Sequence, residues 1–306
     1  MELSEKLCDG GQDQRSLESQ TSNGRSITNR ECSPLEPDKI FNRVIHGSSE
    51  SMTEIPDQSV HLTITSPPYN VGKNYELGQT FEDWLELMRQ VFMEVKRVTC
   101  AGGRLCIVVA NVGRQPYVPL QHYLTGIMLE LGGFLMRGTV IWSKGPSAGV
   151  SSAWGSWKSA SNPCLRDTNE FVLIFSKDHM KRERTGADSI SRDEFLTASK
   201  SVWGDIQTES ARRIGHPSPF PVALASRLIH FYSFRNDLVL DPFVGSGSTA
   251  VAAVLSGRHY VGYDIIESYC QLARKRVKQA MDSISTGNDN HGLESNTAFL
   301  SSCIHS

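Results

Sequence analysis

The feature that most constrains this chain is a glycine-rich turn that comes very late, in "LVLDPFVGSGSTAVAAVLSGRHYVGYDI" (residues 238–265). The pattern predicts a strand, a glycine loop, a helix and a second strand that ends at Asp264. A nucleotide-binding sheet needs several more strands, and fewer than about 40 foldable residues follow Gly245. The other strands must therefore come from earlier in the chain.

The residues around this loop indicate the chemistry of its ligand. Gly245 and Gly247 let the backbone approach a ligand at a helix N-terminus, and Asp264 is placed to accept hydrogen bonds from ribose hydroxyls. Asp241, at the end of the first strand, repels a pyrophosphate but suits a cationic amine. S-adenosylmethionine carries an ammonium, a sulfonium and a ribose. The alternative is an NAD-dependent dehydrogenase, because the glycines with Ala250 also match G-x-G-x-x-A.

A second punctuated stretch, "ITSPPYN", lies near residue 66. Alternating apolar residues from Val60 to Thr65 predict a strand, and Pro67 and Pro68 then stop regular structure. Thr80 and Asp83 resemble a capping box ahead of a helical pattern. Strands are also predicted at 104–111, 139–143 and 170–175, and helices at 123–133 and within 216–233, where Pro221 lies in the first turn. Together they predict an α/β fold with a mostly parallel twisted sheet, whose ligands lie beyond the carboxyl ends of the strands.

Composition limits the class of protein and its boundaries. A formal net charge of -2 excludes a globally basic nucleic-acid coat. Seven cysteines without a CxxC pair indicate neither a disulfide framework nor a metal site. Without an apolar leader or an 18-residue apolar window, we expect a soluble protein with no membrane segment. Residues 1–38 and 284–306 have the polar composition of disordered segments, which leaves 39–283 as the folded domain.

With a proline corner early and a glycine loop late, the chain resembles the β-class DNA amino-methyltransferases (N4-cytosine or N6-adenine type) found in restriction-modification systems. The resemblance covers about residues 40–280. "TSPPY" resembles the catalytic motif, "GSWKSASNP" with "RDTNEFVLIFSK" the segment leading into target recognition, "HPSPFPVALASRLI" the cofactor-side helix and "DPFVGSGST" the cofactor loop. It implies a Rossmann-like S-adenosylmethionine-dependent methyltransferase fold in circularly permuted motif order.

The resemblance also implies roles for individual residues. The Ser66 hydroxyl and the Pro67 carbonyl would each accept one N–H of an exocyclic base amine, which orients its lone pair without covalent catalysis. Pro68 would make that corner rigid, and Tyr69 would stack on a base extruded from the duplex. The implied cofactor-binding residues are Phe220, Asp241, Phe243, Gly245, Gly247, Ser248, Thr249 and Asp264.

The predicted partner is double-stranded DNA, and a homodimer is left open. No acidic residue occurs between Leu131 and Arg166, while basic and tryptophan residues do. We expect target recognition within an insertion at about 145–213. The predicted DNA contacts are Lys144, Trp154, Trp157, Lys158, Arg166, Arg182 and Arg184.

Several alternatives stay open. N4-cytosine is the first choice of target because Ser66 rather than an aspartate opens the tetrapeptide, and N6-adenine is the near alternative. Methylation at ring carbon would use Cys164, but that class has its cofactor loop near the N-terminus. A catalytically silent DNA-binding module is a further alternative, since Ser48 stands where the family has an acid, unless Glu50 substitutes for it. Location is expected to be cytoplasmic, with the nucleoid, in a bacterium and nuclear in a eukaryote.

Overall fold

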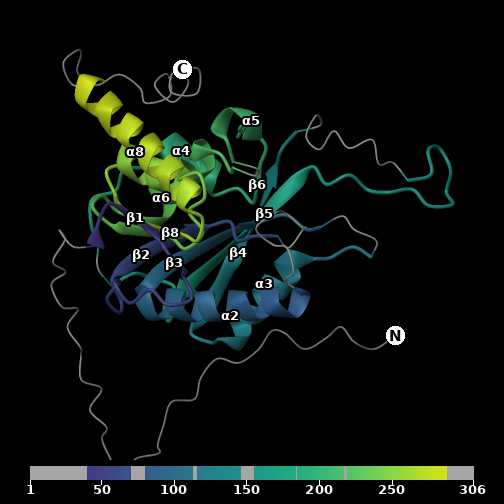
Figure 1. The fold of residues 1–306 in the computed structure, drawn as a ribbon, viewed down its shortest axis with the longest axis horizontal. Coiled ribbons are helices and arrows are strands. Elements are labelled where there is room, and N and C mark those ends of the chain that lie inside the picture. The colour runs from purple at the N-terminus through teal and green to yellow at the C-terminus, as the bar shows by residue number, and fades with distance from the viewer. Residues whose placement is uncertain are drawn as a thin grey trace, which may run out of the picture. The chain divides into compact units, whose positions relative to one another are not determined.

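The computed structural model describes residues 40–69, 80–112, 116–145, 155–183, 185–216 and 219–287. Within these residues one sheet of eight strands forms the centre of the fold (Figure 1). The strands are β1 (Arg43–His46), β2 (Val60–Thr65), β3 (Thr99–Val109), β4 (Phe134–Ser143), β5 (Asn169–Lys177), β6 (Val202–Trp203), β7 (Leu238–Asp241) and β8 (His259–Asp264). The helices are α2 (Phe81–Val98), α3 (Leu120–Glu130), α4 (Arg192–Ala198), α5 (Ala211–Ile214), α6 (Val222–Tyr232), α7 (Ser248–Leu255) and α8 (Glu267–Gly287).

The sheet is mixed, and its parallel half carries both sequence motifs. Its strand order is β1-β8-β7-β2-β3-β5-β4-β6. The neighbours from β1 to β3 are all parallel, whereas β5 is antiparallel to both β3 and β4. The late strands β7 and β8 therefore lie beside the early strand β2, as a permuted motif order requires. Strand β5 falls inside the predicted insertion at 145–213 but belongs to the central sheet.

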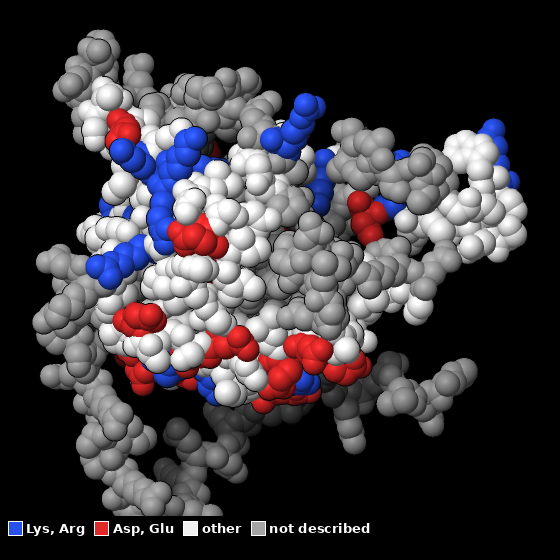
Figure 2. Space-filling view, viewed as in Figure 1, with Lys and Arg blue, Asp and Glu red and all other residues white. Residues whose placement is uncertain are grey.

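Helix α2 shows why the predicted elements form where they do. The Thr80 hydroxyl accepts the Asp83 N–H at 3.1 Å while the Asp83 carboxylate accepts the Thr80 N–H at 2.9 Å, which completes the capping box. One face of the helix is buried, with Trp84 fully enclosed. The opposite face is acidic, and Figure 2 shows Asp and Glu side chains gathered over α2.

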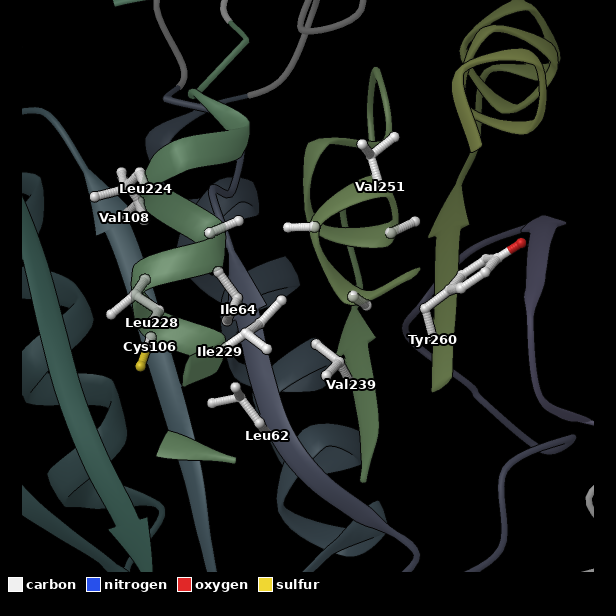
Figure 3. Close-up of a cluster of buried hydrophobic side chains, with 14 of the residues drawn as sticks. Leu62, Ile64, Cys106, Val108, Leu224, Leu228, Ile229, Val239, Val251 and Tyr260 are labelled. Carbon is white, nitrogen blue, oxygen red and sulfur yellow. The ribbon is translucent and has the colours of Figure 1, made fainter. Parts of the chain in front are cut away.

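The sheet is covered on both faces because successive strand residues point to opposite sides. In β3, Leu105 and Ile107 pack in the cluster beneath α2 and α3, while Cys106 and Val108 pack in the cluster beneath α6 and α7. Figure 3 shows the second cluster, where Leu224 and Leu228 of α6 lie over β2 and β3. Two apolar layers thus hold the sheet rigid.

One helix boundary adds detail to the sequence prediction. Helix α8 extends to Gly287, so the boundary predicted at residue 283 falls inside a helix. No helix in the described ranges is both long and apolar enough to cross a membrane.

Candidate active site

The carboxyl ends of β2 and β7 meet at one edge of the sheet, and Asp241 joins them there. This carboxylate is 1% exposed. Its Oδ1 accepts the Thr65 hydroxyl at 2.9 Å and the Phe243 N–H at 3.1 Å, and its Oδ2 accepts the Thr249 hydroxyl at 2.6 Å. One buried side chain therefore links the strand before "SPPY" to the glycine loop.

The environment of Asp241 changes its acidity. Burial raises its pKa to about 6, although the hydrogen bonds from Thr249 and Thr65 act in the opposite direction. The nearby Asp264 adds a smaller increase. Three donors of the chain itself occupy Asp241, so its main visible role is to position the loop; the predicted contact with a cationic ligand stays a prediction.

The glycine loop requires glycine at two positions. Gly245 and Gly247 have φ of 49° and 83°, which side chains rarely adopt. A Cβ on Gly247 would lie 2.8 Å from that of Ala273, and one on Gly245 would lie 3.0 Å from the His216 Nε2. Helix α7 begins directly afterwards at Ser248. The loop thus leads straight into a helix N-terminus, with the Gly245 N–H donated to Asp264 and the Gly247 N–H to the Val244 carbonyl.

Arg276 of α8 holds this loop in place through hydrogen bonds. Its Nη1 donates to the Ser246 carbonyl at 2.8 Å, to the Ser246 hydroxyl at 3.0 Å and to the Ser248 hydroxyl at 3.3 Å. It also pairs with Glu209, whose carboxylate accepts the N–H of Val222 at the start of α6. Sequence reasoning missed Arg276, because nothing local in a polar helix distinguishes it from its neighbours.

Asp264 lies beside the loop at the end of β8. Its carboxylate accepts the Gly245 N–H at 3.0 Å and the Ile266 N–H at 2.9 Å, and burial raises its pKa. His216, which stacks edge-on against Tyr269 with ring centroids 4.6 Å apart, covers Gly245. The quoted "HPSPFP" segment contains His216, but sequence reasoning assigned it no role.

The remaining predicted cofactor residues are Phe220, Phe243, Ser248 and Thr249. Phe220 is partly buried against the cluster beneath α6, and Phe243 against the cluster beneath α2. Ser248 and Thr249 are buried, with their hydroxyls turned to Arg276 and Asp241 respectively. Phe243, Ser248 and Thr249 therefore belong to the loop and the first turn of α7, and the two hydroxyls are engaged within the protein; that these residues and Phe220 bind the cofactor stays a prediction.

The departure noted at Ser48 has a local counterpart. The Gly47 N–H donates to the Asp264 carbonyl at 3.0 Å, so this turn lies at the same edge of the sheet. The Ser48 hydroxyl donates to the Glu50 carboxylate at 2.6 Å. An acid is thus held at this turn, and its use in place of the missing one stays a prediction.

The "SPPY" corner follows β2 and is held by side chains from other elements. The Trp84 indole N–H donates to the Pro68 carbonyl at 2.7 Å. The Ser66 and Tyr69 hydroxyl oxygens are 3.0 Å apart, and the Tyr69 hydroxyl donates to the Glu170 carboxylate at 3.4 Å. Burial, followed by the charge of Glu170, raises the Tyr69 pKa well above its ordinary value. Tyr69 is therefore a neutral phenol.

Two predicted DNA contacts have other partners in the structure. Arg182 is 8% exposed and forms a bidentate ion pair with Asp237 at the opposite, amino-terminal end of β7. That prediction is wrong, because a buried and paired guanidinium is not available to a phosphate. Lys144 forms an ion pair with Glu170 and so lies beside the "SPPY" corner.

The segment between β4 and β5 extends away from the sheet (Figure 1). Trp157 is 64% exposed in it, and the Lys158 Nζ lies 5.8 Å from the Trp157 ring centroid. Arg166 is half-buried. Trp154 and Arg184 lie outside the described residues. Their part in DNA binding, like that of Trp157, Lys158 and Arg166, stays a prediction. Among the described residues no group of three or more His, Cys, Asp or Glu side chains is placed to hold a metal.

Comparisons with known proteins agree with this arrangement. A family model described as DNA methylase matches residues 60–275. A type II methyltransferase of Methanothermobacter thermautotrophicus is 27% identical, with 79% of this chain and 78% of that protein covered. A DNA adenine methyltransferase of Escherichia coli is also 27% identical, with 81% and 87% covered.

Solved structures show the same fold. A Thermus thermophilus protein, assigned as a DNA modification methylase and solved with S-adenosyl-L-methionine, is 30% identical with a TM-score of 0.63. The matched region covers 78% of this chain and 95% of the Thermus thermophilus chain. The PvuII cytosine-N4-specific DNA methyltransferase has a TM-score of 0.62 at 17% identity, and the match covers 80% of this chain and 92% of that chain. At this identity the likeness shows the fold alone. The predicted Rossmann-like methyltransferase fold is confirmed.

Proposed function

This chain belongs to the N6/N4 DNA methylase family, and from that premise we propose that it methylates the exocyclic N4 amine of cytosine in double-stranded DNA at a specific site. The methyl donor is S-adenosyl-L-methionine, which when bound supplies an electrophilic methyl group. The residues present fit this group: the Gly245–Gly247 turn leads into the N-terminus of α7, and the half-buried Asp264 carboxylate lies beside this turn.

The chain's own residues supply orientation and electrostatics. The lone pair of an exocyclic amine is delocalised into the base, so the amine needs two acceptors that turn this lone pair toward the methyl group. Ser66 and the Pro67 carbonyl fill that role, and the Trp84 bond to Pro68 limits movement of the corner. Extruding the base costs a few kcal/mol, which contact with the Tyr69 ring would partly offset.

The observation that carries the choice of cytosine is that Ser66 opens the tetrapeptide at the end of β2. A neutral hydroxyl in this position is the variant that the family tends to pair with cytosine. The relative described as a DNA adenine methyltransferase favours N6-adenine as the second candidate. Both share the orientation mechanism and differ only in the base admitted.

The test compares the wild-type protein, Ser66→Ala and a control, Ser51→Ala, which changes an exposed serine of the segment between β1 and β2. Each is incubated with unmethylated DNA and labelled cofactor, and the nucleosides are identified by mass spectrometry. Losing one transition-state acceptor should lower turnover about 100- to 1,000-fold in Ser66→Ala and leave the control active. Cofactor binding should be intact in both.

The product decides between the candidates. N4-methylcytosine supports the proposal, and N6-methyladenine replaces the base while keeping the mechanism. A labelled methyl group at cytosine C5 would overturn the mechanism and favour Cys164 as the nucleophile. Full activity of Ser66→Ala would remove the catalytic role of the "SPPY" corner, and saturable cofactor binding without any product would favour a silent DNA-binding module.

A further inference from the structure

The hydroxyls of Ser66 and Tyr69 form a chain that ends at a buried carboxylate. Tyr69 lies between Ser66, 3.0 Å away, and Glu170, 3.4 Å away. Its oxygen also accepts the Ala110 N–H. Glu170 is 8% exposed and pairs with Lys144. The four side chains come from the ends of β2, β4 and β5 at the edge of the sheet that holds the glycine loop.

Counting donors and acceptors sets the direction of this chain. An ionised carboxylate only accepts, so the one hydrogen of Tyr69 goes to Glu170. The Tyr69 oxygen has two lone pairs, of which Ala110 fills one. The other is left for the Ser66 hydrogen. Ser66 therefore donates inward, and both of its lone pairs are left for a group outside.

From this direction we infer that Glu170 is a positioning residue that acts through Tyr69 to hold Ser66 as a pure hydrogen-bond acceptor toward the target amine. The inference rests on the proposed function, because it concerns the atom that binds the amine. A serine hydroxyl rotates freely and can present either its hydrogen or its lone pairs. A hydrogen facing the amine N–H would repel it, so the direction decides whether Ser66 assists.

The site explains why a carboxylate is retained at this buried position. A buried charge is costly unless it is paired and hydrogen-bonded, and Glu170 has both Lys144 and Tyr69. Lys144, predicted as a DNA contact, supplies the counter-charge of Glu170, and its contact with DNA stays a prediction. Glu170 was not predicted at all, since it begins a strand rather than ending one.

The first test is a double-mutant cycle on methyl transfer with Tyr69→Phe, Glu170→Gln and the double variant. An amide that donates to Tyr69 reverses the chain, so Glu170→Gln should lower kcat about 10- to 100-fold while the cofactor KM stays unchanged. In the Tyr69→Phe background the same change should add less than about threefold. Glu82→Gln, an exposed carboxylate of α2, is the matched control and should retain full activity.

An equal loss from Glu170→Gln in both backgrounds would overturn the inference, because Glu170 would then act independently of Tyr69. If Glu170→Gln does not fold, Glu170→Asp is used in the same cycle. It keeps the charge opposite Lys144 but draws the acceptor back by one methylene, and it should likewise lose its effect without the Tyr69 hydroxyl.

The second test needs no activity, which separates this inference from the proposed function. The Tyr69 signal in ¹³C-tyrosine-labelled protein is identified by its absence in Tyr69→Phe and titrated with pH. The Tyr69 pKa should lie well above the ordinary phenol value in the wild type and fall in Glu170→Gln, because the neighbouring charge is removed. An unchanged titration would overturn the chain. A wild type that methylates no DNA but shows this shift would overturn only the proposed function.

Discussion

The buried carboxylate of Asp241 should make the stability of this protein depend on pH in an unusual direction. Its pKa is raised by burial from an ordinary 3.8 to about 6. Folding therefore favours the protonated form, so this group's contribution to stability is fully present below about pH 4 and is lost as the pH rises through about 6. Most native carboxylates with ion-pair partners have the opposite effect.

The magnitude follows from the same two values. Moving a pKa from 3.8 to about 6 corresponds to about 3 kcal/mol at full effect, of which about 2 to 3 kcal/mol develops between about pH 4 and pH 7. Asp241→Asn does not titrate. Its amide oxygen still accepts from Thr65 and Phe243, and the Thr249 hydroxyl turns to accept from its NH₂ group.

The assay is urea unfolding of wild type and Asp241→Asn at several pH values from about 4 to 7. The free energy of unfolding of the variant minus that of the wild type should rise by about 2 to 3 kcal/mol over this range, whatever its starting value. Asp193→Asn, which changes an exposed aspartate of α4, is the matched control for the substitution itself. A flat or falling difference for Asp241→Asn would refute the argument that burial dominates its environment.

The other predictions concern single side chains. Asp264→Ala should weaken cofactor binding about tenfold or more, because charge-assisted hydrogen bonds to the cofactor are lost. An unchanged Kd in calorimetry would show that the cofactor does not bind beside Asp264. Arg276→Met should lower the free energy of unfolding by about 2 to 4 kcal/mol and raise the cofactor Kd, since the glycine loop loses its fastening; an unaltered melting temperature would contradict this. Arg182→Met should lower the free energy of unfolding by about 3 to 5 kcal/mol, because the buried Asp237 carboxylate loses its ion-pair partner. The affinity for DNA should not change. Lys158→Ala should leave stability unchanged but weaken DNA binding, and the slope of log affinity against log salt concentration should become smaller by about 1. A loss of stability in this variant would argue against an exposed DNA contact.

The elements that carry the two motifs were predictable because their signals are local. Alternation in β2, the capping box of α2 and the glycines of the loop before α7 each depend on residues within one turn or strand. The late position of the glycine loop then required that early strands complete its sheet. The permuted order and the edge that holds Ser66 and Asp264 followed from sequence.

The partners of the charged side chains were decided only by the tertiary structure. Arg182 looked like a DNA contact because its neighbours in sequence are basic, but folding places it against Asp237, 55 residues away. Glu170 reaches Tyr69, 101 residues away, because β5 runs antiparallel to β3 and so begins where β2 ends. Strand direction and pairing are set by long-range packing of the two apolar layers, and no local pattern of residues contains that information.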